Sequence, residues 1–218
     1  MMDTQETGTK RNSRFAIQLA LLGLILVGLP AGSWYYLQKG LDYRLAVKNE
    51  LKELGTLSPM AFDLLSGQEL EFKRIENKVV VVGFFLDPNH SDSPQNAAFL
   101  SQLHQQFNQR DDVLFLVYGD SGKVEDFRPL MENSGLDSDP EQIFQLAGGT
   151  DPGLLKQQYH VGTGELQNTF VLIDPENQVR RTYDVRQTKE LKLLVEHITY
   201  LFPQQAEKDL IFKRDSEK

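Results

Sequence analysis

The chain has 218 residues, of which 40% are hydrophobic and 25% charged, a formal net charge of −8, and no cysteine. This composition excludes a largely disordered chain, and the acidic balance argues against a nucleic-acid partner bound through a basic surface. The absence of cysteine excludes disulfides, thiolate nucleophiles, zinc–thiolate clusters and redox dithiols.

An uncharged apolar segment near the N-terminus predicts a transmembrane helix over residues 15–36, which would hold the chain in a lipid bilayer. At ~1.5 Å per residue this helix spans roughly 33 Å, enough to cross a hydrocarbon core of about 30 Å. The segment ends in the aromatic run Trp34–Tyr36, and the basic stretch Lys10–Arg14 precedes it. The positive-inside tendency therefore predicts a single-pass protein of the cytoplasmic (inner) membrane, with residues 1–14 in the cytoplasm and the C-terminal part outside.

The same segment allows a second interpretation, a cleaved signal peptide with a small-residue cleavage site at Ala31–Ser33. Both interpretations export the bulk of the chain. Beyond the apolar segment, the sequence predicts a juxtamembrane helix and linker over residues 37–57, a folded extracytoplasmic or periplasmic domain over residues 58–203, and a charged C-terminal tail over residues 204–218.

Strands and helices alternate in the first half of the exported domain. Residues 61–72 form two short alternating stretches around Ser66-Gly67, which predicts a hairpin. Residues 79–86 (VVVVGFFL) are apolar on both faces and rich in β-branched side chains, as in a strand buried within a sheet. Ser93-Pro94 then predicts a helix start, with serine as N-cap and proline at the first helical position.

The second half continues the alternation and closes with an antiparallel pair. The expected elements are a buried strand over 113–118, a helix over 124–133, a short helix over 154–159, strands over 169–173 and 179–183, and a helix over 191–201. Buried strands that alternate with helices imply a parallel core sheet, to which the closing hairpin adds antiparallel strands. We therefore expect the α/β class, as a three-layer α/β/α thioredoxin-like fold with an N-terminal transmembrane helix.

Two stretches of sequence resemble a known family. FDLLSGQELEFKRIENKVVVVGFFL, followed by a loop with proline, looks like the entry to extracytoplasmic thioredoxin-like proteins, and TFVLIDPENQVRRTYD is similar to the hairpin of the Sco/SenC group. That group consists of membrane-anchored copper-handling proteins that help to assemble the copper-A centre of cytochrome c oxidase. The resemblance covers about residues 58–203 and implies the thioredoxin-like fold.

The residues that bind copper in that group are missing from this chain. The group carries a CxxxC motif after the central strand, and its two cysteine positions fall here on Asp87 and Ser91. The distal histidine of the group would fall on Leu166, and the cis-proline of ordinary thioredoxin-type oxidoreductases would fall near Gln167. The resemblance thus implies the fold without its thiol chemistry, so we expect no catalytic residue, no cofactor and no enzymatic activity.

Other side chains near the positions of the missing cysteines allow a different metal site. Asp87 and His90 lie on the loop after the central strand, and His160 lies on the segment before the closing hairpin. Two imidazoles and a carboxylate, with Asp92 as a further ligand, suit zinc or copper(II). The competing interpretation is that Asp92 and Ser93 cap the following helix and that His90 is a solvated loop residue.

The rest of the sequence supplies no catalytic constellation. His104 and His197 lie on predicted helices near charged or amide residues, and we expect both on the surface. Two functions from different classes remain. The first is a non-catalytic accessory or assembly factor for a respiratory copper enzyme such as cytochrome c oxidase, whose partners would be membrane proteins, namely oxidase subunits or their maturation factors. The second is a copper or zinc chaperone that uses Asp87, His90 and His160.

Overall fold

The structure is a computed structural model that describes residues 8–148 and 151–202, and the chain divides into two compact units, residues 1–49 and 50–218. The N-terminal unit is helical, with α1 (Gly8–Gly23), a π-helical turn (Leu24–Gly28) and α2, which runs from Leu29 to Glu50. Within the described residues, Ile17–Glu50 is the one helix long and apolar enough to cross a membrane. The chain therefore carries an N-terminal apolar helix of the kind that serves as a membrane anchor or a signal sequence.

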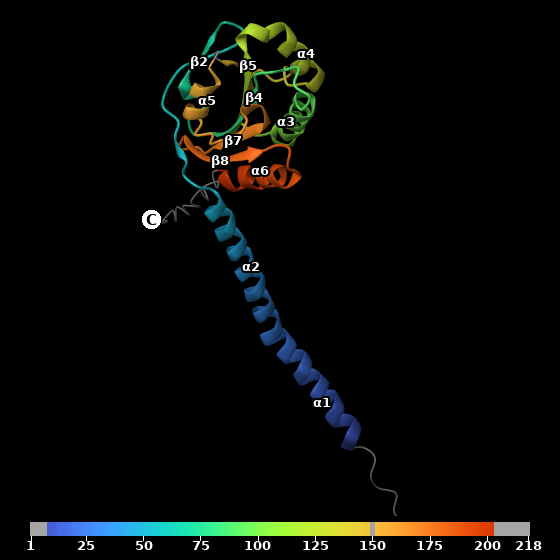
Figure 1. Cartoon of the computed structure of the whole chain (residues 1–218). Helices are drawn as coiled ribbons and strands as arrows, with labels where there is room; N and C mark the ends of the chain where they lie inside the picture. The colour runs from blue at the N-terminus through green and yellow to red at the C-terminus, as the bar shows by residue number, and fades with distance from the viewer. Residues whose placement is uncertain (1–7, 149–150, 203–218) are drawn as a thin grey trace, which may run out of the picture. The chain divides into compact units, whose positions relative to one another are not determined.

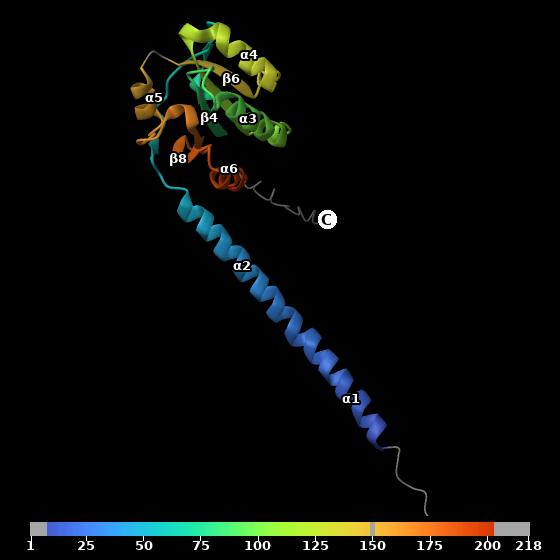
Figure 2. The ribbon, with the colours of Figure 1, turned by 45° about the vertical axis from the view of Figure 1, so that its right-hand side comes forward.

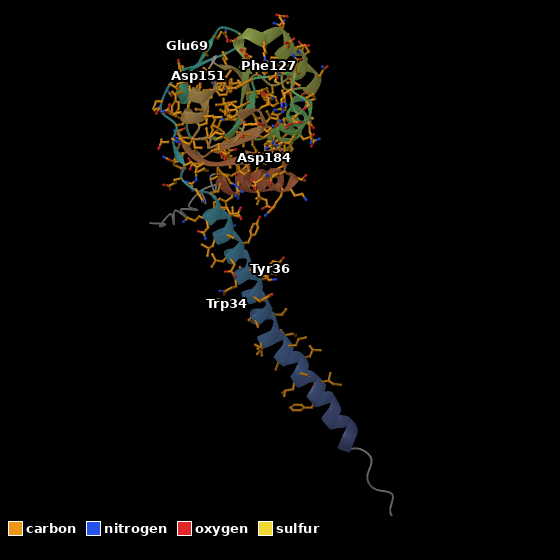
Figure 3. The ribbon with its side chains drawn as sticks, viewed as in Figure 1. Trp34, Tyr36, Glu69, Phe127, Asp151 and Asp184 are labelled. Carbon is orange, nitrogen blue, oxygen red and sulfur yellow. The ribbon has the colours of Figure 1, made fainter. Side chains whose placement is uncertain are left out.

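Pro30 explains the π-helical turn. Proline has no backbone N–H, and its ring crowds the carbonyl group four residues earlier, which here belongs to Leu26. The helix widens just before this point, and the N–H of Leu29 donates to the carbonyl of Leu24, five residues back. On the same unit, Trp34 and Tyr36 project from α2, with 70% and 82% of their surface exposed (Figure 3).

The second unit contains a six-stranded sheet in the order β1-β8-β7-β4-β5-β6 and a two-stranded sheet, β2-β3 (Figure 1). The strands are β1 (Gly55–Thr56), β2 (Phe62–Asp63), β3 (Glu69–Leu70), β4 (Val79–Phe85), β5 (Val113–Asp120), β6 (Ile143–Gly148), β7 (Thr169–Ile173) and β8 (Gln178–Asp184). β4, β5 and β6 are parallel, whereas β7 pairs antiparallel with both β4 and β8. All seven residues of β4 are buried, as expected for a strand covered on both faces.

Helices cover both faces of the six-stranded sheet. They are α3 (Ser93–Phe107), α4 (Val124–Ser134), α5 (Pro152–Gln158) and α6 (Thr188–Leu201). On one face α3 packs through Phe99 on Phe170, and α6 packs on β8. On the other face Tyr159, which directly follows α5, contacts Phe84 and Tyr118. Figure 2 shows α3 and α5 on opposite sides of β4. The expected three-layer thioredoxin-like fold is confirmed.

The structure adds two strands to those expected from the sequence. β6 includes Gln145, Ala147 and Gly148, residue types of low strand propensity, so its pattern alone did not indicate a strand. Its regular pairing with β5 makes it one. β1 has only two residues, and its pairing with β8 defines it. Both are edge strands, whose conformation depends on a partner distant in the sequence.

Candidate functional site

The loop Asp87–Asp92 leaves the carboxyl end of β4, the edge at which open α/β sheets hold their ligands. Two backbone bonds form tight turns in it, because the N–H of His90 donates to the carbonyl of Asp87 and the N–H of Ser93 to that of His90, each at 3.0 Å. Within the loop, Pro88 is buried. The loop is therefore held in place at the position where the resemblance leads one to expect thiols.

The side-chain amide of Gln167 forms hydrogen bonds with this loop and with the start of α3. Its Oε1 accepts from the backbone N–H of Asp87 at 3.0 Å, and its Nε2 donates to Oγ of Ser93 at 2.7 Å. Ser93 is fully buried, and its hydroxyl in turn donates to the carbonyl of Asp87 at 2.8 Å. The amide of Gln167 thus binds a donor on the loop, the N–H of Asp87, and an acceptor on the first turn of α3, the hydroxyl oxygen of Ser93.

The buried amide of Asn96 extends the arrangement. Nδ2 of Asn96 donates to the carbonyl of Gln167 at 3.0 Å and to Oδ1 of Asn168 at 3.2 Å. Asn96 and Asn168 are only 3% and 2% exposed. Asp87, Ser93, Asn96, Gln167 and Asn168 are called the Gln167 network below. Because buried polar groups are costly when they lack partners, this network fixes the segment before β7 against the loop after β4.

Charged side chains surround the network on the surface. Nζ of Lys123 lies 3.1 Å from Oδ1 of Asp87, with both side chains close to half exposed. Arg186 binds Asp184 through two side-chain hydrogen bonds and lowers the pKa of that carboxyl group to about 2. Exposed ion pairs of this kind contribute at most ~1 kcal/mol each, so they shape the surface more than they stabilise it.

His90 is partly exposed and already has a partner within the loop. Its Nδ1 accepts from the backbone N–H of Asp92 at 3.2 Å and lies 3.8 Å from Oδ2 of the same residue. The expected side-chain cap of α3 is wrong in detail. Asp92 is the N-cap residue but its side chain makes no cap hydrogen bond, and the Ser93 hydroxyl is used by the Gln167 network.

His160 lies away from the loop. A Cβ atom on Gly55 would lie 2.1 Å from Nε2 of His160, so the imidazole sits against the backbone of β1. Strand register through β8 and β7 places Gly55 level with Val80, near the start of β4. Asp87 follows the opposite end of β4, seven residues farther along a strand that rises about 3.3 Å per residue. His160 and the loop therefore lie at different ends of the sheet.

The three candidate metal ligands are not brought together. Asp87 pairs with Lys123, His90 is bonded within its own loop, and His160 contacts β1. Among the residues that the structure describes, no group of three or more His, Cys, Asp or Glu side chains is placed to hold a metal ion. The donor set also lacks the soft thiolates that suit copper(I), so these residues do not fit the metal that the family resemblance implies.

The other two histidines are buried, which corrects the expectation that both are on the surface. His104 is 7% exposed, and its Nε2 lies 3.1 Å from Oδ2 of Asp139 while its ring packs edge-on against Phe115. His197 is fully buried, with Nδ1 2.7 Å from the hydroxyl of Tyr183. Both imidazoles have a specific polar partner, which makes their burial possible.

Sequence reasoning also missed the role of Gln167. The position was notable only because the proline of thioredoxin-type enzymes would fall there. The available signal was an amide two residues before the predicted strand 169–173, together with Asn96 on the helix predicted to start at Ser93-Pro94. Nothing in the linear sequence relates Gln167 to Asp87, 80 residues away.

No known family model matches the chain, and no curated protein matches it. Solved structures do share its fold. A SCO1/SenC family lipoprotein from Bacillus anthracis is 18% identical, covers 67% of this chain and 94% of its own, and has a TM-score of 0.52. BsSco, a member of the Sco family of cytochrome c oxidase assembly proteins, is 13% identical over 66% of this chain and 91% of its own, with a TM-score of 0.53. A thiol-disulfide oxidoreductase from Bacteroides fragilis is 16% identical, covers 66% of this chain and 99% of its own, and has a TM-score of 0.51.

Proposed function

We propose that this chain is a membrane-anchored, thiol-less Sco-like protein that acts by binding a partner, as an accessory or assembly factor for a respiratory copper enzyme such as cytochrome c oxidase. The observation that carries the proposal is the Gln167 network. The loop that would carry thiols is cysteine-free, and amide hydrogen bonds link it to the first turn of α3 and to Gln167, just before β7. A loop fixed in this way presents a constant surface, which suits recognition because little conformational entropy is lost on binding.

Two further observations support the proposal. The fold is shared with a Sco-family lipoprotein and with an assembly protein of cytochrome c oxidase. The apolar helix Ile17–Glu50 is long and apolar enough to serve as an anchor, and the basic residues before it favour an N-terminus in the cytoplasm and a domain outside the cytoplasmic membrane. An anchor raises the local concentration of the domain near a membrane partner, so a weak surface contact is sufficient.

Affinity capture from detergent-solubilised membranes tests this function. Tagged full-length protein is expected to recover oxidase subunits or oxidase maturation factors. Recovery of cell-wall or transport proteins alone would contradict the proposal. Ser91, an exposed residue of the loop, allows a sharper version, because Ser91→Arg adds a bulky charge to the proposed binding surface.

The matched control is Gln109→Arg. Gln109 is also exposed but lies after α3 and before β5, at the other end of the sheet from the loop. Ser91→Arg is expected to reduce capture by at least about tenfold, which corresponds to ~1.4 kcal/mol, whereas Gln109→Arg should leave it unchanged. Equal capture by both variants would show that the loop does not form the binding surface.

A further inference from the structure

His197 is a buried histidine that lies where α6 meets β8, close to Glu50, the first residue of the second unit. Figure 1 shows α6 along β8. His197 is fully buried, as are its helix neighbours Leu194 and Ile198, which face the core. The Tyr183 hydroxyl lies 2.7 Å from Nδ1 of His197. The proposed function makes no use of this contact, and it lies outside the Gln167 network.

Burial keeps the Tyr183 hydroxyl protonated beside the imidazole. Burial raises the pKa of Tyr183 far above its ordinary value, so the phenol keeps its proton and is able to donate a hydrogen bond to Nδ1 of His197. In the tautomer that accepts this bond, the neutral imidazole carries its own proton on Nε2. That nitrogen is buried and has no hydrogen-bond partner among the described residues, since Oε2 of Glu50 lies 3.7 Å away.

Charged groups of both signs face the imidazole from three elements. They are Arg181 on β8, Glu50 at the end of α2, and Glu190 and Glu196 on α6 itself. Arg181 holds Glu50 through Nη1 at 2.9 Å and Glu190 through Nη2 at 3.0 Å. The pKa of His197 is lowered, first because burial disfavours the charged ring and second because Arg181 repels it, while the three carboxylates act in the opposite direction.

We propose that His197 makes the packing of α6 on β8 depend on pH, so that acidification below about pH 6.5 loosens the helix. Protonation at Nδ1 removes the acceptor of the Tyr183 hydroxyl. It also leaves a charged ring with no exposed surface, which becomes hydrated only when α6 moves away from β8. In the closed state α6 is packed on β8, and the pKa of His197 lies below its ordinary value of about 6.5, whereas in the open state His197 is hydrated and has the ordinary pKa. At pH values between these two pKa values the open state binds more protons than the closed state, so opening of α6 becomes easier as the pH falls.

The test uses the full-length protein in detergent micelles, with side-chain NMR of the histidines and hydrogen exchange of the α6 amides at about pH 7.5 and about pH 5.5. His197 should titrate below 6.5. The exchange rates are corrected for intrinsic exchange to give the opening constant of α6. This constant should rise on acidification by up to about tenfold for each pH unit by which His197 titrates below 6.5. Titration of His197 at or above 6.5 would overturn the proposal.

Three variants isolate the imidazole. His197→Gln should abolish the pH response of α6, and His90→Gln, at a partly exposed histidine on the loop after β4, should retain it. Glu50→Gln removes a carboxylate that favours the charged ring and should enlarge the response. If acid instead tightens α6, a His197–Glu50 ion pair dominates and the proposal is wrong. Should His197→Gln fail to fold, the titration of the native chain and of Glu50→Gln decides the question.

Discussion

At the scale of single residues, Gln167 connects parts of the chain that the sequence keeps far apart. Its side chain reaches the backbone of Asp87 and the hydroxyl of Ser93, while its own carbonyl accepts from Asn96. An amide suits this position because it combines two donor hydrogens with an acceptor oxygen on one rigid group. Each of these bonds contributes a modest net free energy, but loss of the side-chain amide would take one partner each from the backbone N–H of Asp87 and from the buried hydroxyl of Ser93.

We therefore expect Gln167→Ala to destabilise the domain by ~1–3 kcal/mol, because Asp87 N–H and the Ser93 hydroxyl lose a partner. Urea denaturation measures the loss, and hydrogen exchange should show faster opening at residues 87–93. Gln157→Ala is the control, since Gln157 is exposed on α5, and its free energy of unfolding should change by less than about 0.5 kcal/mol. Equal stability of the two variants would show that the network contributes nothing.

Gly119 gives a second prediction at this scale. A Cβ atom there would lie 2.7 Å from Cδ2 of Phe127, a buried ring on α4 that is labelled in Figure 3. Gly119→Ala should lower the free energy of unfolding by ~1–3 kcal/mol, because the ring and the helix have to shift. Gly162→Ala meets nothing within 4 Å and serves as the control in the same denaturation experiment. Its stability should stay equal or rise slightly as the unfolded chain loses freedom.

At the scale of elements, the apolar N-terminal helix is of the kind that serves as a membrane anchor or a signal sequence. Ile17–Glu50 is continuous apart from the widened turn before Pro30, and its apolar side chains are exposed. Such a surface is stable in hydrocarbon and not in water. The aromatic residues Trp34 and Tyr36 mark the level at which the interface is expected.

Retention of this helix can be measured directly. We expect the membrane fraction to contain the protein at its full mass of 24.9 kDa and to keep it through carbonate extraction, because about 20 apolar residues hold a helix in the bilayer. Intact-mass spectrometry distinguishes the anchor from a signal peptide. A product that begins near Ser33 would establish cleavage and contradict the anchor.

At the scale of the whole molecule, the missing cysteines provide a clean background for mapping topology. Single substitutions Thr4→Cys and Ser66→Cys introduce the only thiol into each variant. In intact cells, a membrane-impermeant maleimide should label Ser66→Cys, at an exposed position between β2 and β3, and should label Thr4→Cys only after lysis. The reverse pattern would invert the membrane orientation and remove the extracytoplasmic partner from consideration.

Much of the fold was predictable because its signals are local. The continuous apolar run of β4, the turn between β7 and β8, and the apolar periodicity of α6 each follow from short stretches of sequence. β1 and β6 were missed because edge strands with weak propensity become strands only through pairing with distant residues. His104 and His197 were misplaced for the same reason, since their partners Asp139 and Tyr183 lie on other elements.

By itself, the sequence determined that this protein has an apolar N-terminal helix, a thioredoxin-like domain and no thiol chemistry, because hydrophobic pattern and residue type are properties of the chain. Only the tertiary structure decided what occupies the place of the missing thiols. In the folded domain His160 lies away from the loop after β4, and Asp87 forms an ion pair with Lys123. The side chain of Gln167 binds the backbone of the loop where the family carries its cysteines. These outcomes depend on strand register and burial, which bring together residues that lie far apart in the sequence.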